Sequence, residues 1–295
     1  MYLLICFFCV FILGMLVAIV CSRKHQQHKK ENHAPKEMLV SHLDVVEALE
    51  RAFKQKNFRI LYQPIYGVKE KRIVACEALL RIQDPEHGWL TPSTFIPTAE
   101  SSGKIFEIGC MVMEEVCSFL SKNHVKELGL DYVNVNLSVT ECKDDRLTDY
   151  LIEIIDRYQI ERSKIRLEIK EADLEEDHDM IRSNLERLND LGVGLALDGY
   201  GTGHSTFSHI ISFPFCSVKF DKTMLWSAMA STKALYALCA SINMLKDLDM
   251  HIVVEGAESE EMVEQLIELR CDYLQGFYFA RPMKEEDFVE FMSNN

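Results

Sequence analysis

The sequence predicts a mostly parallel α/β barrel that follows an N-terminal transmembrane helix. Three observations lead to this fold class. Short apolar segments typical of strands alternate with longer segments that have the apolar spacing of helices. Polar or charged residues stand near the ends of successive strands, as they do at the active rim of such a barrel. The length beyond residue 40, about 255 residues, fits one domain of this kind.

The elements follow one another in a regular order. Apolar residues at helical spacing predict helices over residues 42–55, 106–120, 146–158, 179–191, 232–248, 260–269 and 285–292. Short apolar runs predict strands over residues 59–62, 73–81, 132–137, 165–169, 193–197, 218–220, 252–254 and 277–279. Only a short charged connection joins the first two strands, so we expect this pair to be antiparallel.

The N-terminal segment differs in character from the rest of the chain. Residues 2–21 are uncharged and mostly apolar, which is long enough for a helix to cross a bilayer. No basic residue precedes this segment, and five follow it closely: Arg23, Lys24, Lys29, Lys30 and Lys36. This asymmetry predicts a single-pass protein of the cell membrane with its C-terminal side in the cytoplasm. A cleaved signal peptide is the alternative, but the basic region that normally begins one is missing.

The expected organisation is therefore a membrane anchor over residues 1–21, a basic linker over 22–40 and a barrel domain over 41–295. The formal net charge is −14, and because residues 23–36 contribute +4, residues 37–295 carry −18. A domain this acidic is a poor partner for polymeric nucleic acid, so cations would have to mediate binding of a phosphate ester. The seven cysteines after residue 40 form no CxxC pair, which indicates reduced thiols.

Seven residues near the strand ends are the candidate site. They are Glu77, Asn136, Glu168, Asp198, Lys219, Asp221 and Glu255. The carboxyl ends of parallel barrel strands meet at one mouth, so we expect these side chains to converge. Carboxylate and amide oxygens suit hard divalent cations. Any one of these residues alone would more simply be a solvated strand end or a turn residue, and only the set as a whole favours a metal site.

Nine short motifs carry a resemblance to a known family. They are EALLR at residues 77–81, YQPI at 62–65, FIPTAE at 95–100, VNLS at 135–138, LEIKE at 167–171, LDGYGTG at 197–203, VKFD at 218–221, VVEGAE at 253–258 and QGFYFARP at 275–282. Together, and in their order along the chain, they resemble the EAL domain family, the cyclic di-GMP phosphodiesterases. The resemblance implies a modified TIM-type (β/α)8 barrel with one antiparallel strand.

The resemblance also implies roles for particular residues. Glu77, Asn136, Glu168 and Asp198 would hold a first Mg²⁺ or Mn²⁺, and Asp198 would bridge to a second ion beside Asp221 and Glu255. Lys219 would lie by the attacking water and act in catalysis with Glu77 and Glu255. Cyclic di-GMP would contact Gln63, Arg81, Gln275 and Pro282, with Phe279 near Pro282 on the far wall, although ordinary core packing explains these last two equally well. Glu171 would brace the loop after Asp198, and the family commonly forms homodimers through the barrel.

The sequence departs from the family at two positions. Gly199 stands where the family has a second aspartate that ligates the second metal, and Lys170 stands where it has a threonine. Lys170 either points to the mouth, by strand alternation, or faces water beyond the strand end. Two functions therefore stay open. One is a membrane-anchored phosphodiesterase with weakened activity that converts cyclic di-GMP to pGpG. The other is a degenerate EAL domain that acts as a cyclic di-GMP receptor or a protein-interaction module.

Overall fold

In the part of the chain that the structure describes, eight strands close into a barrel, and a ninth pairs with the end of one of them outside the ring. The computed structural model describes residues 41–122, 128–174, 179–201 and 206–294. Around the barrel the strands pair in the order β1, β9, β8, β7, β6, β5, β4, β2, and β2 closes the ring by pairing with β1. Their bounds are β1 Phe58–Gly67, β2 Arg72–Asp84, β3 Gly88–Leu90, β4 Tyr132–Asn136, β5 Ile165–Lys170, β6 Gly194–Tyr200, β7 Ser217–Phe220, β8 His251–Glu255 and β9 Tyr273–Gln275.

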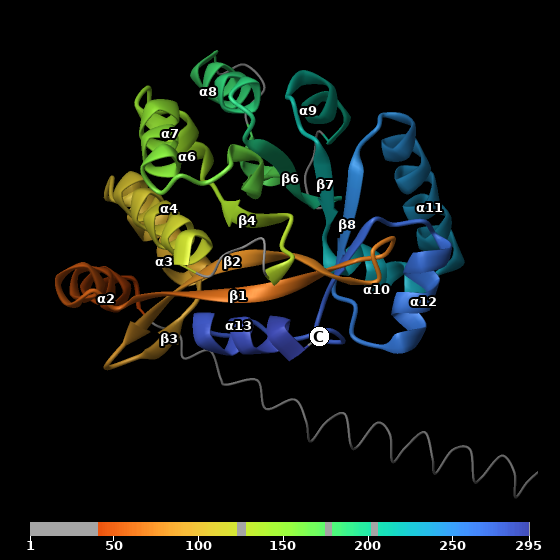
Figure 1. The fold of residues 1–295 in the computed structure, drawn as a ribbon, viewed down its shortest axis with the longest axis horizontal. Helices are drawn as coiled ribbons and strands as arrows, with labels where there is room; N and C mark the ends of the chain where they lie inside the picture. The colour runs from red at the N-terminus through yellow and green to blue at the C-terminus, as the bar shows by residue number, and fades with distance from the viewer. Residues whose placement is uncertain (1–40, 123–127, 175–178, 202–205, 295) are drawn as a thin grey trace, which may run out of the picture. The chain divides into compact units, whose positions relative to one another are not determined.

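Helices surround the strands on the outside (Figure 1). They are α2 His42–Gln55, α3 Pro92–Ser101, α4 Ile105–Lys122, α6 Val139–Cys142, α7 Leu147–Arg157, α8 Asp179–Asp190, α9 Thr206–Ser212, α10 Lys222–Ala230, α11 Thr232–Asp247, α12 Glu260–Glu268 and α13 Glu285–Asn294. Two 3-10 turns, Arg162–Lys164 and Glu171–Asp173, flank β5. Each predicted helix is present, with ends within two residues of those expected. The short helices α3, α6, α9 and α10 were not predicted.

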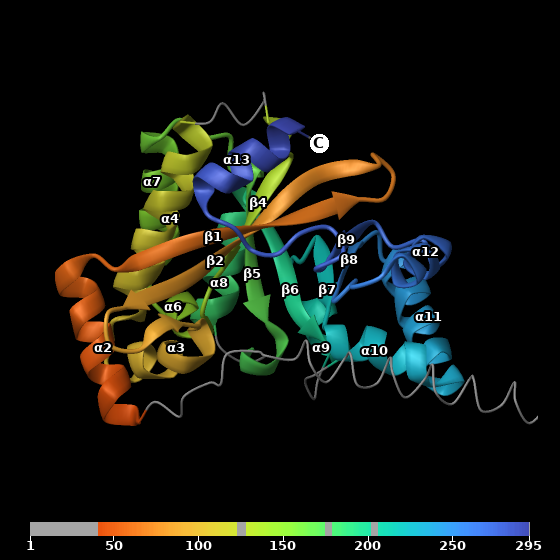
Figure 2. The ribbon, with the colours of Figure 1, turned by 90° about the horizontal axis from the view of Figure 1, so that it is seen from below.

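The antiparallel pair at the start of the barrel is confirmed. Strands β1 and β2 pair from Phe58 opposite Ile82 to Gly67 opposite Arg72. Strand β1 is also antiparallel to β9, whereas the successive pairs from β2–β4 round to β8–β9 are parallel. In Figure 2, strands β5, β6 and β7 run in one direction, toward α9 and α10. Their carboxyl ends, together with the middle of β2, form the mouth of the barrel.

The last predicted strand, over residues 277–279, is wrong. The strand is β9, four residues earlier, and residues 277–279 form a turn instead. The turn is fixed by two backbone hydrogen bonds, from Tyr278 N to Ala257 O (3.0 Å) and from Phe279 N to Gly276 O (3.2 Å). Phe277 and Tyr278 are about half exposed. The apolar residues 277–279 therefore belong to a turn at the rim of the barrel and not to one of its strands.

The proposed membrane segment, residues 2–21, lies outside the described residues. Among the helices that the structure describes, none is both long and apolar enough to cross a membrane. The compact barrel unit comprises Val45–Asn295. Its seven cysteines, Cys76, Cys110, Cys117, Cys142, Cys216, Cys239 and Cys271, are all free thiols, as their spacing indicated.

Candidate active site

Lys219 lies at the centre of the mouth. Its side chain comes from β7 and is only 1% exposed. Its Nζ lies 2.7 Å from Glu77 Oε2, 3.1 Å from Glu168 Oε2 and 2.8 Å from Glu255 Oε1. These three carboxylates belong to β2, β5 and β8, so closure of the barrel brings together residues that are far apart in the sequence. Burial alone would lower the pKa of Lys219, but Glu168, Glu255, Glu77 and Asp198 raise it well above its ordinary value, which keeps the ammonium charged.

A network of amides completes one side of this cluster. Asn136 Nδ2 donates to Glu77 Oε1 (3.0 Å), and Gln275 Nε2 donates to Glu77 Oε2 (2.8 Å). Gln275 Nε2 also donates to Gln63 Oε1 (3.2 Å), and Gln63 Nε2 donates to Ala280 O (3.3 Å). Burial would raise the pKa of Glu77, but Lys219 and the donors Gln275 and Asn136 together lower it below its ordinary value. Glu77 is therefore an ionised carboxylate held in a fixed orientation.

The pKa values of the other three carboxylates shift in the opposite direction. Burial is the main cause that raises the pKa of Glu168, Asp198 and Glu255, and Lys219 opposes it in each case. Glu168 is additionally repelled by Glu77, Asp198 and Glu255. The mouth thus holds four carboxylates beside one buried ammonium, which is an excess of negative charge in a site shielded from water.

Asp198 belongs to β6 and is followed by a β-bulge. It pairs with Lys219 on one side and with Lys170 on the other, and the register shifts before Tyr200. Gly199 is the bulge residue and has φ +77°, a left-handed conformation that glycine adopts without strain. Lys170 is the last residue of β5 and is exposed, and its charge counteracts the rise in the pKa of Asp198. It is therefore both part of the strand and open to water.

Asp221 and Glu171 interact with the loops around the mouth. The Asp221 carboxylate caps α10, accepting hydrogen bonds from Thr223 N (2.7 Å) and from the Thr223 hydroxyl. Glu171 is 2% exposed, and its Oε2 accepts from Gly201 N (3.1 Å). Glu171 thus contacts the segment after Asp198, where the resemblance had placed its bracing role.

The residues expected to contact substrate lie on two sides of the mouth. Arg81 is half buried on β2, and its Nη1 donates to Leu80 O (2.7 Å). Burial lowers the pKa of Arg81, and the Glu77 charge counteracts this. Phe279 stacks on Tyr66 with ring centroids 4.7 Å apart, and Pro282 is half buried near the following bridge between Met283 and Tyr62. A cavity of about 180 Å³ at the mouth is lined by Gln63, Lys222, Glu255, Gly256, Glu258, Gln275, Gly276 and Phe277.

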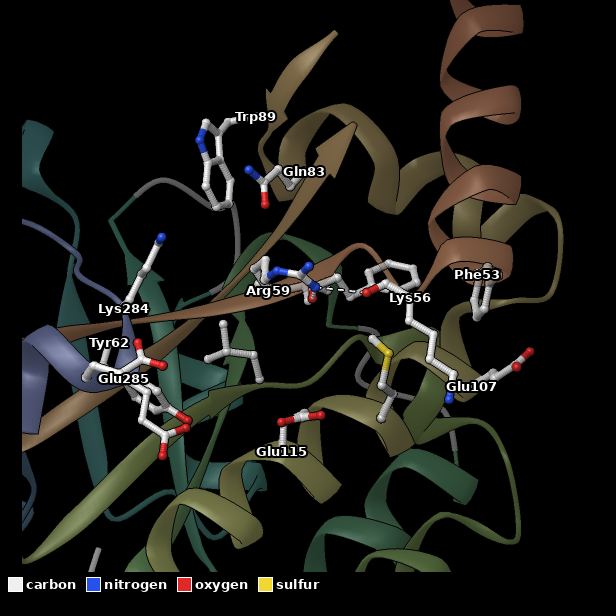
Figure 3. Close-up of a pocket in the computed structure, with 15 residues that line it drawn as sticks. Phe53, Lys56, Arg59, Tyr62, Gln83, Trp89, Glu107, Glu115, Lys284 and Glu285 are labelled. Atoms are coloured by element: carbon white, nitrogen blue, oxygen red, sulfur yellow. Dashed lines mark hydrogen bonds between the residues drawn. The ribbon is translucent and has the colours of Figure 1, made fainter. Parts of the chain in front are cut away.

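A larger groove, of about 660 Å³, lies outside this site. Figure 3 shows it between the β1–β2 hairpin, the end of α2, helix α4 and the start of α13. Its lining mixes aromatic rings such as Trp89 with both acidic and basic side chains, among them Glu115 and Arg59. Arg59 Nη1 donates to Lys56 O (2.8 Å) and Phe58 O (2.6 Å), so it fixes the turn from α2 into β1. None of the strand-end residues of the mouth lines this groove.

The donor set of the mouth suits a hard divalent cation. Four carboxylates and the amide of Asn136 are the oxygen ligands that Mg²⁺ and Mn²⁺ prefer, and a cation would offset the excess negative charge. Within the described ranges, no three His, Cys, Asp or Glu side chains already stand in a ligating arrangement. Instead, three of the carboxylates converge on the Lys219 ammonium, which in this geometry supplies the positive charge.

Sequence reasoning missed one polar residue inside the barrel. Asn134 is 1% exposed, and its Nδ2 makes a short hydrogen bond to Glu168 Oε1. It stands two residues before Asn136 on β4, so both side chains point into the barrel. The alternation in the run NVN could have revealed it, because an inward polar residue at this depth needs a partner.

Comparison with known proteins agrees with this geometry. The profile of the EAL domain matches residues 46–282, and the chain belongs to that family. Oxygen sensor protein DosP of Escherichia coli K12 is 31% identical over 261 residues, covering 88% of this chain and 33% of DosP. MucR of Pseudomonas aeruginosa, named a bifunctional diguanylate cyclase/cyclic di-GMP phosphodiesterase, is 31% identical over 252 residues, covering 84% of this chain and 36% of MucR. This chain thus spans about a third of the length of these relatives.

A solved structure extends the comparison to three dimensions. The PaMucR phosphodiesterase, in a cyclic di-GMP complex, superposes with a TM-score of 0.77 at 30% identity, covering 83% of this chain and 99% of that one. The barrel fold, including its extra strand, is that of the EAL family.

Proposed function

We propose that this protein is a membrane-anchored cyclic di-GMP phosphodiesterase that produces pGpG with weakened activity. The observation that carries the proposal is the cluster around Lys219, where carboxylates from β2, β5 and β8 meet one buried ammonium. Family membership and the likeness to a phosphodiesterase in complex with cyclic di-GMP support the choice of substrate.

The proposed cofactor is Mg²⁺ or Mn²⁺. Glu77, Asn136, Glu168 and Asp198 would hold a first ion, and Asp198, Asp221 and Glu255 a second. When bound, these ions would supply positive charge for the phosphoryl oxygens and lower the pKa of the attacking water. The amide network around Glu77 supports this assignment, because it fixes that carboxylate before any ligand arrives.

The chain's own groups would bind and orient the dinucleotide. The Arg81 guanidinium would donate to a non-bridging phosphate oxygen, where its planar fork gives paired hydrogen bonds. Gln63 and Gln275, linked side chain to side chain, would contact the substrate from the neighbouring strands β1 and β9. Lys219 would stabilise the negative charge that develops as the water oxygen bonds to phosphorus. As this bond forms, the bond from phosphorus to the 3′ oxygen breaks; the water gives up one proton to solvent, and the 3′ oxygen takes up one proton from solvent.

Gly199 is the reason we propose weakened activity. Glycine offers no carboxylate to the second ion, and the side chain of Asp221 already caps α10. Loss of a group that merely supports a metal ligand costs about 10 to 100-fold in affinity or activity, and a lost ligand should cost at least as much.

The test is hydrolysis of cyclic di-GMP by the full chain in detergent, run in Mg²⁺ and in Mn²⁺ beside a binding titration in Ca²⁺. Release of pGpG that depends on metal would support the proposal. Binding without turnover in either metal would favour the alternative that Gly199 suggests, a receptor that has lost its chemistry. No binding and no turnover would leave a protein-interaction role.

The membrane and dimer assignments are also proposals. The apolar segment at residues 2–21 and the basic residues after it support a single-pass anchor with the barrel in the cytoplasm. A reporter fused after Asn295 should be active only in the cytoplasm, and activity on the other side of the membrane would reject this topology. A homodimer through the barrel rests on family resemblance, and sedimentation of the detergent-solubilised chain would test it.

A further inference from the structure

Asn134 lies directly beneath the site, one layer deeper in the barrel. Its Cα partners in the sheet are Glu77 on β2 and Arg166 on β5. Since side chains alternate along a strand, Asn134 points inward like Asn136, two residues later. The residue is 1% exposed, so water does not solvate its amide.

The amide of Asn134 and the ammonium of Lys219 hold the two oxygens of Glu168. Nδ2 of Asn134 donates to Oε1, and Nζ of Lys219 lies 3.1 Å from Oε2. With one donor on each oxygen, the carboxylate cannot rotate about its last bond without losing both contacts. Glu168 is otherwise surrounded by the negative charges of Glu77, Asp198 and Glu255, which would push it away from the centre of the mouth.

The orientation of the amide follows from its neighbours. Turned the other way, Asn134 would place its oxygen against the carboxylate of Glu168, and two acceptors would repel each other. On the other side of the residue, Asn134 Oδ1 and Arg166 Nη1 are both buried without a hydrogen-bond partner among the described residues. An acceptor and a donor on paired residues of neighbouring strands are complementary. The guanidinium of Arg166 is itself held by stacking on the Tyr132 ring, 3.6 Å from its centroid.

We propose that Asn134 is a positioning residue for Glu168: it fixes that carboxylate as a ligand for the divalent cation. The inference rests on the proposed function, since it assigns Glu168 to the metal site. A neutral amide suits this role, because it donates a hydrogen bond without adding a charge. A lysine at this position would compete with the cation, and an aspartate would repel Glu168.

The matched comparison uses two equally buried asparagines. Asn184 on α8 is also 1% exposed and bonded, accepting from Thr148 Oγ1 (2.8 Å) and donating to Cys142 O (3.0 Å), but it bonds to none of the mouth residues. We expect Asn134→Leu in the full chain to weaken Mn²⁺ binding by about 10 to 100-fold, the range for a group that supports a metal ligand. Asn184→Leu should lower the melting temperature and leave Mn²⁺ affinity within about twofold of the unmodified chain.

A second pair keeps the test decisive if Asn134→Leu does not fold. Asn134→Thr and Asn134→Val have nearly the same shape and both suit a strand, but only threonine keeps a donor. Threonine should retain more Mn²⁺ affinity than valine at equal melting temperature. Equal affinities in this pair, or an unchanged affinity in Asn134→Leu, would overturn the positioning role.

The proposed function is judged separately, by pGpG release from the unmodified chain. If that chain binds Mn²⁺ without hydrolysing cyclic di-GMP, the phosphodiesterase assignment fails while a loss of affinity in Asn134→Leu still supports the positioning role. If the unmodified chain hydrolyses cyclic di-GMP and Asn134→Leu binds Mn²⁺ normally, the phosphodiesterase assignment stands and the positioning role of Asn134 fails. An unmodified chain that binds no Mn²⁺ overturns both.

Discussion

The two halves of the barrel mouth are built differently. On the half formed by β1, β2, β4, β5 and β9, nearly every polar side chain is fixed by another: Gln275 and Asn136 donate to Glu77, Gln63 accepts from Gln275, and Asn134 donates to Glu168. On the half formed by β6 and β7, Asp198 of β6 is followed by a glycine bulge, and Asp221, just after β7, caps α10. Glu255 on β8 reaches the first half only through Lys219.

This difference shows which part of the site is preorganised. A carboxylate with a donor on each oxygen keeps its position when a ligand arrives, so less ordering entropy opposes binding. The half around Glu77 and Glu168 therefore holds its carboxylates in fixed orientations, as our proposed first-metal site requires. The half around Asp198 lacks one carboxylate and has its next one, Asp221, engaged elsewhere. We therefore expect substitutions in the half around Glu77 to cause larger changes in activity than substitutions in the half around Asp198.

The largest effect should come from Glu77, the centre of the fixed half. Glu77→Ala removes the acceptor of Asn136 and Gln275 and one of three partners of Lys219. We expect the rate of cyclic di-GMP hydrolysis to fall by at least about 100-fold and Mn²⁺ binding to weaken, because a lost ligand costs more than a lost supporting group. The matched control is Glu115→Ala, an exposed glutamate of the outer groove (Figure 3), which should leave the rate unchanged. If Glu77→Ala keeps its activity, the central role given to Glu77 in the fixed half is wrong.

Next in size is the effect of Arg81 on ligand binding. Arg81→Ala should weaken cyclic di-GMP binding, measured by calorimetry in Ca²⁺, by about 1.5 to 3 kcal/mol, the range for a hydrogen bond to a charged group. The control is Arg187→Ala, an exposed arginine whose partner is Asp149 on a helix outside the barrel. A similar loss in both variants would mean that the effect is general electrostatics rather than a contact in the mouth.

Gly199 tests the other half. Gly199→Asp adds the missing carboxylate, but at φ +77° an L-residue is strained by about 1 to 2 kcal/mol. We therefore expect the variant to be less stable and its rate in saturating Mn²⁺ to rise by no more than about 10-fold, the lower end of the range for groups that support a metal. Gly199→Ala carries the same strain without the carboxylate, so it should lose stability with no gain in rate. Equal rates in the two variants would show that the second half needs no further ligand.

The last effect is on stability and concerns the support beneath the fixed half. Glu141 is buried and caps α6, just after Asn136, by accepting from Ser138 N (2.9 Å). Burial, opposed by the Ser138 N–H and reinforced by Glu100, raises the pKa of Glu141 from 4.5 to about 8. The folded state therefore keeps a proton that the unfolded state releases, and the unfolding free energy should fall as pH rises between about 4.5 and 8, by at most about 1.4 kcal/mol per pH unit.

Glu141→Gln removes this titrating group and keeps a capping side chain. We expect the free energy of unfolding in urea to change less between pH 6 and pH 8 in the variant than in the unmodified chain. An equal difference in the two proteins would mean that Glu141 stays ionised in the folded state and adds nothing to the pH dependence.

Much of the fold was predictable because it depends on local patterns. Seven of the described helices follow from apolar spacing, and their ends lie within two residues of those predicted. The antiparallel start of the barrel follows from the short connection between residues 67 and 72, which leaves no room for a crossover. The run at residues 277–279 misled the prediction because hydrophobicity alone does not distinguish a strand from an apolar turn at the rim. Helix α6 was not predicted because its four residues are too few to show a helical periodicity.

For the candidate site, too, the sequence predicted some features and only the tertiary structure showed the others. Residue types and motif order identified the carboxylates, the lysine and the unusual glycine without any coordinates, because metal and phosphate chemistry needs particular side chains. The sequence also determined the charge of the domain and the positions of most of its strands. Only the tertiary structure decided that Lys219 sits among three carboxylates, that Asp221 caps a helix, that Gly199 has a positive φ and that Asn134 holds Glu168. Most of these contacts join residues separated by tens or hundreds of positions, and their distances depend on how the barrel closes, which no local pattern encodes.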